Sequence, residues 1–238
     1  MTTASAALAE RLRLRKITRL CHLTPSRNLV HIACEGGVSS TGLLESDASA
    51  VFTPQDRLRL DRRRSHISCS IQYPNAWYLR QKKNPGGEAG IFRDWVVLGL
   101  NPRCMLWPDT LFCPENAAGS GGANLRGGPD GFDAMYADLV VDSSKRIFNR
   151  ENSRLKPCPT NDQAEVMIAG RIPLEDIESI FVPDTAQAAR VHAQLEQVGA
   201  DPGGFRYVIA KSFFDPRQMS AEIRKGVAPA EIPWNPPG

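Results

Sequence analysis

Short strand patterns separated by irregular segments constrain the fold of this chain most. Residues His66–Gln72 alternate between apolar and polar side chains, which predicts a strand with one buried face. Trp95–Leu100 is a continuous apolar run and predicts a central strand. Pro74 and Asn75 predict a turn after the first strand, and 82–90 predicts a loop. Strands joined by irregular segments rather than by helices are typical of an α+β domain, not a doubly wound one.

The same kind of pattern predicts the other elements. We expect strands near 17–23, 164–168, 177–182 and 205–210, and helices near 6–20, 28–34, 132–141 and 185–198. The glycine-rich stretch 115–131 and the polar, basic stretch 143–162 should be irregular, and the proline-rich tail 227–238 extended. The sequence contains no repeat and no natural boundary. We therefore expect one domain over residues 1–238.

Basic residues gather in three clusters, although the formal net charge is only +3. The clusters span residues 11–19, 57–64 and 145–156. Clustered Arg and Lys can contact phosphate groups even when the total charge is modest. Each cluster can equally be a solvated face, but we expect at least one of them to contact phosphate.

Cysteine spacing and hydropathy exclude several classes. The six cysteines form no C-x-x-C pair, and although Cys21 precedes His22, no spacing supports a zinc site, so we expect no metal. No apolar run approaches the ~20 residues of a membrane span. Basic residues interrupt the N-terminal stretch throughout, unlike a signal peptide. We expect a cytoplasmic protein with reduced thiols and no membrane contact.

A carboxylate stands at the start of a predicted strand. Glu165 follows Gln163 by two residues, so strand alternation predicts that both side chains share one face. The neighbours Ala164, Val166 and Ile168 are small or apolar, and would hold the carboxylate rigidly beside a core. A glutamate at a strand edge is, taken alone, more often a solvated residue.

Glu165 lies in one of four short sequence motifs. They lie at 20–32, 59–75, 94–118 and 159–177. In this order they resemble the DarT family, the toxins of DarT–DarG toxin–antitoxin systems, over roughly residues 17–182. The sequence departs from the family pattern at Leu23, where an aromatic is common, in the long insertion 117–131, and in the three consecutive arginines at 62–64.

The resemblance implies a fold and a set of donor residues. The fold is an α+β ADP-ribosyltransferase-like fold, in which two facing β-sheets form an NAD cleft and helices lie at the periphery. Glu165 would be the catalytic carboxylate. His22 would contact one of the two NAD riboses, with Thr24 and Asn28 beside the dinucleotide, although a buried structural histidine is the alternative. An arginine should lie at the NAD phosphates, because its planar fork makes paired bonds; our choice is Arg59, and its competitors are Arg57, Arg62, Arg63 and Arg64.

The implied reaction transfers ADP-ribose from the co-substrate NAD to a base, thymine or guanine, in single-stranded DNA. Gln163 would orient the acceptor, and Arg150, Arg154 and Lys156 would bind the flanking phosphates. Single strands also need stacking aromatics, and the candidates, each of which can equally be a core residue, are Tyr73, Trp77, Tyr78 and Phe148.

The resemblance also implies a partner protein, and two other functions stand as alternatives. A toxin of this kind needs an antitoxin that removes the adduct, either a macrodomain or another ADP-ribosyl-hydrolysing protein. We expect the enzyme itself to be a monomer. The same chemistry on RNA or protein is one alternative, and a catalytically silent NAD- or nucleic-acid-binding module is another.

Overall fold

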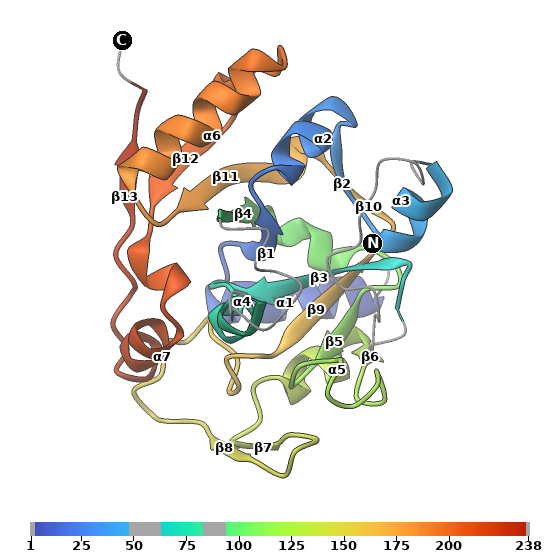
Figure 1. Ribbon diagram of the computed structural model, residues 1–238. Helices are drawn as coiled ribbons and strands as arrows, with labels where there is room; N and C mark the ends of the chain where they lie inside the picture. The colour runs from blue at the N-terminus through green and yellow to red at the C-terminus, as the bar shows by residue number, and fades with distance from the viewer. Residues whose placement is uncertain (1–2, 48–62, 83–93, 237–238) are drawn as a thin grey trace.

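A nine-stranded mixed sheet forms the centre of the computed structural model, which describes residues 3–47, 63–82 and 94–236 (Figure 1). The strand order is β13-β12-β11-β4-β1-β3-β9-β5-β6. In chain order the bounds are β1 Leu20–Pro25, β3 His66–Ile71, β4 Trp95–Leu100, β5 Leu111–Cys113, β6 Arg126–Gly127, β9 Glu165–Ala169, β11 Ile177–Val182, β12 Arg206–Ile209 and β13 Ile232–Trp234. Neighbouring strands are antiparallel except β11 and β12, which are parallel and joined through helix α6, Thr185–Gln197.

The junction between β1 and β3 divides this sheet into two groups of strands. β1 pairs with β4 along its whole length, but with β3 only through Leu20 and Cys21. Beyond Cys21 the two strands separate, and β3 pairs with β9 instead. Figure 1 shows β9 and β5 on one side of β3 and β1, β4 and β11 on its other side. The sheet is thus continuous, but its two halves share only a short seam.

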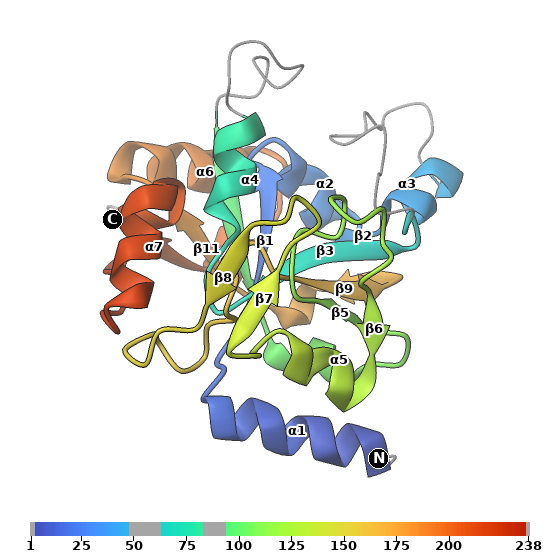
Figure 2. The same cartoon turned by 90° about the horizontal axis from the view of Figure 1, so that it is seen from below.

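Two ribbons and the remaining helices surround the sheet. β2, Gly37–Ser39, pairs with β10, Arg171–Pro173, and β7, Leu139–Val141, pairs with β8, Ile147–Asn149. The other helices are α1 Thr3–Arg15, α2 Asn28–Cys34, α3 Thr41–Asp47, α4 Ala76–Lys82, α5 Gly128–Ala134 and α7 Pro216–Arg224, and short 3-10 helices cover 102–106, 174–176, 202–204 and 211–214. Seen from below, α1 lies under α5, and α7 lies on the opposite side of the β7–β8 ribbon (Figure 2).

The local sequence explains where α6 and α7 begin. Asp184 caps α6 by accepting a hydrogen bond from the Gln187 backbone N–H at 2.8 Å. Asp215 caps α7 in the same way through the N–H groups of residues 217 and 218, and Pro216 occupies the first turn. Apolar residues at helical spacing, such as Ala188, Val191 and Leu195 in α6, are buried.

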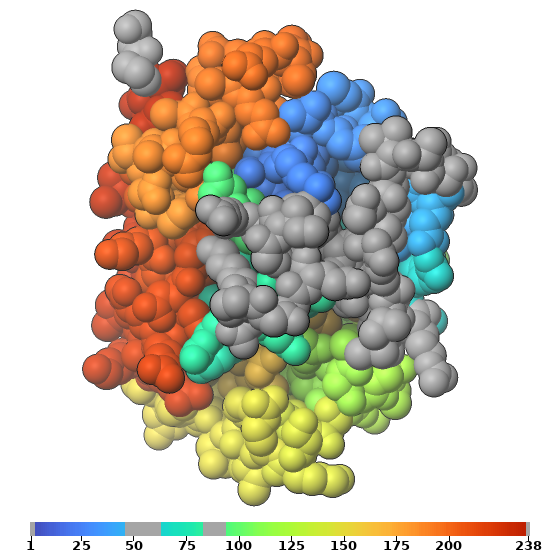
Figure 3. Space-filling model, in the orientation of Figure 1, coloured from blue at the N-terminus to red at the C-terminus, as the bar shows by residue number. Residues whose placement is uncertain are grey.

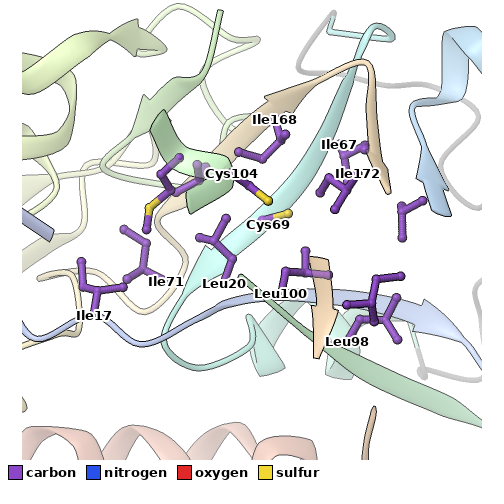
Figure 4. Packing of buried hydrophobic residues seen from close by; sticks show 14 of the residues in the cluster. Ile17, Leu20, Ile67, Cys69, Ile71, Leu98, Leu100, Cys104, Ile168 and Ile172 are labelled. Atoms are coloured by element: carbon purple, nitrogen blue, oxygen red, sulfur yellow. The ribbon is translucent and has the colours of Figure 1, made fainter. Parts of the chain in front are cut away.

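The main core fills the space where the two strand groups meet. Figure 4 shows Leu20 of β1, Cys69 of β3 and Ile168 of β9 gathered beside Cys104 of the 102–106 helix. A second cluster lies on another face and joins Cys21, Tyr73 and Phe213 to Met219 and Ile223 of α7. The helix α7 therefore belongs to the packed body and not to a loose tail.

Most predicted elements are confirmed, and the errors fall in irregular stretches. The strands at 66–72, 95–100, 164–168, 177–182 and 205–210 and the helices at 28–34 and 185–198 are present within a few residues. The helix predicted over 132–141 is wrong, because α5 ends at Ala134 and 139–141 forms β7. The stretches 115–131 and 143–162 contain β6, the start of α5, and β8. The extended tail is confirmed in part, since 232–234 pairs with β12 as an edge strand.

No helix of the described ranges is long and apolar enough to cross a membrane. All six cysteines lie within these ranges, and none forms a disulfide. The described residues contain no group of three or more His, Cys, Asp or Glu side chains that could hold a metal ion.

Candidate active site

Glu165 is the first residue of β9, and its side chain is partly exposed. The strand is held on both sides, since β3 pairs with Val166 and β5 places Cys113 opposite Glu165. The carboxylate oxygen Oε2 accepts a hydrogen bond from the Ala117 backbone N–H at 3.0 Å. Because Val166 and Met167 are fully buried, the backbone that carries Glu165 is fixed by the core.

A second carboxylate, which sequence reasoning missed, orders the segment that carries the Ala117 N–H. Glu115 is only 2% exposed. It accepts hydrogen bonds from the Ser143 backbone N–H and from Asn124 Nδ2, both at 2.6 Å. Glu115 thereby ties the glycine-rich stretch to the turn between β7 and β8. A lone acidic residue in a loop gives no sequence signal of such burial.

The thiol of Cys113, which lies opposite Glu165 on the neighbouring strand β5, is a poor nucleophile. Burial raises the pKa of Cys113 to about 12, and the nearby Glu165 charge acts in the same direction. The thiolate is the reactive form of cysteine, so Cys113 stays protonated and inert at neutral pH.

Gln163 does not share a strand face with Glu165. Residues 162 and 163 form a turn, and β9 begins only at Glu165, so the alternation argument fails there. Asn161 builds the turn: its Oδ1 accepts from the Gln163 backbone N–H at 2.9 Å, and its carbonyl accepts from Ala164 N–H at 3.1 Å. Gln163 is partly exposed, immediately before the carboxylate.

The basic residues before this turn have separate roles. The side chain of Arg154 is 1% exposed and forms an ion pair with Asp162, and its Nε donates to the Pro159 carbonyl at 2.6 Å. This guanidinium is occupied inside the protein, which does not fit the predicted contact with a DNA phosphate. Arg150 is partly buried and donates to the Cys158 carbonyl at 2.9 Å, whereas Lys156 is exposed.

The three predicted NAD residues lie on β1 and at the start of α2. The His22 ring lies just beyond the last paired residue of the β1–β3 seam, and its Nδ1 is 2.9 Å from the Ser68 carbonyl oxygen. Thr24 lies two residues further along β1, and its hydroxyl accepts a hydrogen bond from Asn28 Nδ2 of α2 at 2.9 Å. The ring of His22 thus bridges the two strand groups where they separate.

The predicted phosphate arginine, Arg59, lies outside the described residues, as do Arg57 and Arg62. The other two competitors are described. Arg63 and Arg64 line a pocket of about 690 Å³ together with His66. Arg64 also forms an ion pair with Glu45.

The four aromatic candidates divide between the core and the surface. Tyr73 is buried and packs edge-on against Phe213, so it is a core residue. Trp77 and Tyr78 of α4 are partly exposed, and Lys82 Nζ lies 5.3 Å from the centre of the Tyr78 ring. Phe148 of β8 is partly exposed beneath Arg146, whose guanidinium carbon is 5.8 Å from the ring centre.

Solved structures share this architecture. The chain matches Thermus sp. 2.9 DarT in complex with NAD+ with a TM-score of 0.52 and 15% identity, over 83% of this chain and 97% of that one. It matches the same protein in complex with ADP-ribosylated ssDNA with a TM-score of 0.52 and 12% identity, over 84% and 97%. For Thermosipho africanus DarTG in complex with ADP-ribose, the TM-score is 0.52 and the identity 15%, over 83% of this chain and 51% of that one. At such identities the likeness shows a common fold, and it confirms the expected α+β ADP-ribosyltransferase-like fold.

The sequence comparison is more specific. No curated protein matches the chain. A family model described as "ssDNA thymidine ADP-ribosyltransferase, DarT" matches residues 21–214, which include β3, β9, Glu115, Glu165 and all of β1 except Leu20. This match confirms the predicted resemblance, and the chain belongs to the DarT family.

Proposed function

We propose that Glu165 is the catalytic carboxylate with which this DarT-family enzyme transfers ADP-ribose from NAD to thymidine in single-stranded DNA. The family match supports the reaction and the thymidine acceptor. The observation that carries the assignment of Glu165 is its placement: a partly exposed carboxylate on a buried strand, oriented by the Ala117 N–H.

The chemistry follows from the bond that breaks. The N-glycosidic bond of NAD cleaves, nicotinamide leaves with the bonding electrons, and positive charge develops at the anomeric carbon. A carboxylate at a ribose hydroxyl stabilises this charge more than it stabilises intact NAD. A thymine atom then bonds to the anomeric carbon, and the proton that the base loses passes to Glu165. The products are ADP-ribosylated DNA, nicotinamide and one proton.

The donor side is assigned to the β1–α2 segment. Thr24 and Asn28 are joined by a hydrogen bond, and the His22 ring lies two residues earlier on β1, where the two strand groups separate and its Nδ1 is held at the Ser68 carbonyl. Polar side chains that the protein already holds by hydrogen bonds suit the ribose hydroxyls of a dinucleotide, because little ordering is needed on binding. We keep Arg59 as the proposed partner of the NAD phosphates.

The acceptor side is assigned to residues 150–163, which run into Glu165 and are called the acceptor segment. Gln163 precedes the carboxylate and would orient the base. The exposed Lys156 and the partly exposed Arg150 would bind flanking phosphates. Arg154 is not part of this proposal, since its guanidinium is buried against Asp162.

An antitoxin partner belongs to the same proposal. One matched structure is described as a DarTG protein, which supports a DarG-type partner that hydrolyses the adduct. Expression of the active enzyme alone should then be lethal, and co-expression of an ADP-ribosyl-hydrolysing macrodomain should restore growth. The monomeric state and the cytoplasmic location stay predictions of the sequence.

The test uses labelled NAD with single-stranded DNA, RNA and bulk protein in parallel. We expect label on DNA alone, and mass spectrometry of digested nucleosides should place it on thymidine. Label on RNA or protein only would contradict the proposed acceptor. Label on another nucleoside would correct the base and leave the reaction standing.

A further inference from the structure

The helix α7 lies just beyond the residues that the family model matches. The family match ends at residue 214, whereas α7 covers Pro216–Arg224. Its buried residues Met219 and Ile223 pack into the second core cluster, together with Cys158 of the acceptor segment. Figure 3 shows the red surface of this region lying against the yellow surface of the acceptor segment.

Main-chain and side-chain hydrogen bonds join α7 to the start of the acceptor segment. Ser153 Oγ donates to the Arg224 carbonyl at 2.6 Å, and the Leu155 N–H donates to the Ile223 carbonyl at 3.0 Å. Gly226, with φ +73°, ends the helix, and a Cβ there would lie 2.6 Å from the Ser153 carbonyl oxygen. The close approach of these two stretches therefore requires glycine.

A partly buried chain of polar groups joins α7 to the end of the segment. Trp77 Nε1 donates to Ser220 Oγ at 3.2 Å, and Ser220 Oγ donates to Asp162 Oδ2 at 2.6 Å. The other oxygen of Asp162 receives the Arg154 guanidinium, which also holds the Pro159 carbonyl. The Asp162 side chain is 7% exposed. The Ser220 hydroxyl accepts from Trp77 and donates its one proton to Asp162. The two contacts together fix the orientation of the hydroxyl and of the Asp162 carboxylate.

We propose that α7 positions the acceptor segment, and that Ser220 does so through Asp162. Asp162 stands one residue before Gln163 and three before Glu165, so its orientation sets where the turn presents a DNA base. This inference rests on the proposed function of that turn. The contacts of α7 described above go to 153–162 and to Trp77, so its effect should fall on DNA and not on NAD.

The experiment measures steady-state transfer in the full chain, with NAD and a thymidine-containing oligonucleotide varied in turn. In Ser220→Ala we expect KM for the oligonucleotide to rise at least fivefold and KM for NAD to stay within twofold. Ser220→Thr keeps the hydroxyl and should restore most of the affinity. Gln218→Ala, on the exposed side of the same helix, should behave as wild type.

A purely structural role would give a different pattern. A smaller folded fraction lowers kcat and leaves both KM values unchanged. That pattern in Ser220→Ala, or an equal rise of both KM values, would overturn the inference. If Ser220→Ala does not fold, Ser153→Ala removes an exposed contact of the same helix and should raise KM for the oligonucleotide by a smaller factor; unchanged KM there would also overturn the inference.

The wild-type measurement distinguishes a failure of this inference from a failure of the proposed function. If wild type labels no DNA, the proposed function fails and the inference falls with it. If wild type labels DNA and Ser220→Ala keeps the wild-type KM for the oligonucleotide, only the inference fails.

Discussion

The proposed donor and acceptor segments are held in place by different kinds of contact. The donor residues His22, Thr24 and Asn28 sit on a strand and a helix, and each is positioned by main-chain geometry and one nearby side chain or carbonyl. The acceptor segment is irregular, and side-chain contacts hold it: the ion pair between Arg154 and Asp162 within the segment, and the Ser220 hydroxyl of α7. The donor side is therefore held mainly by the sheet and its main chain, whereas the acceptor side depends on side-chain contacts that can vary without disturbing the sheet.

The largest effect should come from breaking the ion pair on the acceptor side. Asp162→Ala removes the buried carboxylate of Arg154 and leaves its guanidinium the longer ion pair with the partly exposed Glu151 at 3.4 Å. Breaking a buried pair typically costs about 3–5 kcal/mol. Urea unfolding should show a loss of this size. The matched control is Glu10→Ala, which removes a fully exposed ion pair with Arg13 and should cause no measurable change. A stability of Asp162→Ala close to that of wild type would show that the acceptor segment is not held by this pair.

A smaller loss is expected where the glycine-rich stretch supports Glu165. Glu115→Gln places an amide N–H₂ against the Ser143 N–H or against the Asn124 Nδ2 group, where two donors would face each other. An unsatisfied buried group costs roughly 1–3 kcal/mol. We expect that loss in unfolding experiments together with a lower kcat, because the Ala117 N–H would shift from Glu165. A wild-type kcat in Glu115→Gln would show that Glu115 does not support the active site.

The donor side should respond in affinity and not in stability. In His22→Ala we expect KM for NAD to rise about tenfold, which corresponds to about 1.4 kcal/mol, with KM for the oligonucleotide unchanged. This is the opposite of the pattern expected for Ser220→Ala. If both variants raise the same KM, the division into donor and acceptor segments is wrong.

The smallest effect concerns the thiols. Five cysteines are buried, and burial raises the pKa of Cys21, Cys104 and Cys158 to about 12. Cys34 is exposed at the end of α2. A maleimide should label Cys34 alone in the native protein at neutral pH and all six cysteines in denaturant, without loss of transfer activity. Rapid native labelling of a second cysteine would contradict the packing of the core.

The same contrast explains what the sequence could predict. The strands at 66–71 and 95–100 follow from local apolar patterns, and so does α6 with its Asp184 cap. The role of Arg154 could not be predicted, because a basic residue in a polar stretch gives no sign of a buried partner. The start of α7 could have been predicted, because Asp215-Pro216 is typical of a helix start. The placement of Gln163 on a strand face fails for a third reason, since the Asn161 turn contains residues 162 and 163 and the strand begins only at Glu165.

Transfer by Glu165→Gln tests the central assignment most directly. Glutamine keeps the size of the side chain and an oxygen that can accept from the Ala117 N–H, so the variant should fold and bind NAD like wild type. Without the negative charge, the rate of ADP-ribose transfer to a thymidine-containing oligonucleotide should fall by a factor of about 10²–10³ or more. A Glu165→Gln enzyme that modifies thymidine within tenfold of the wild-type rate would show that another group carries the reaction.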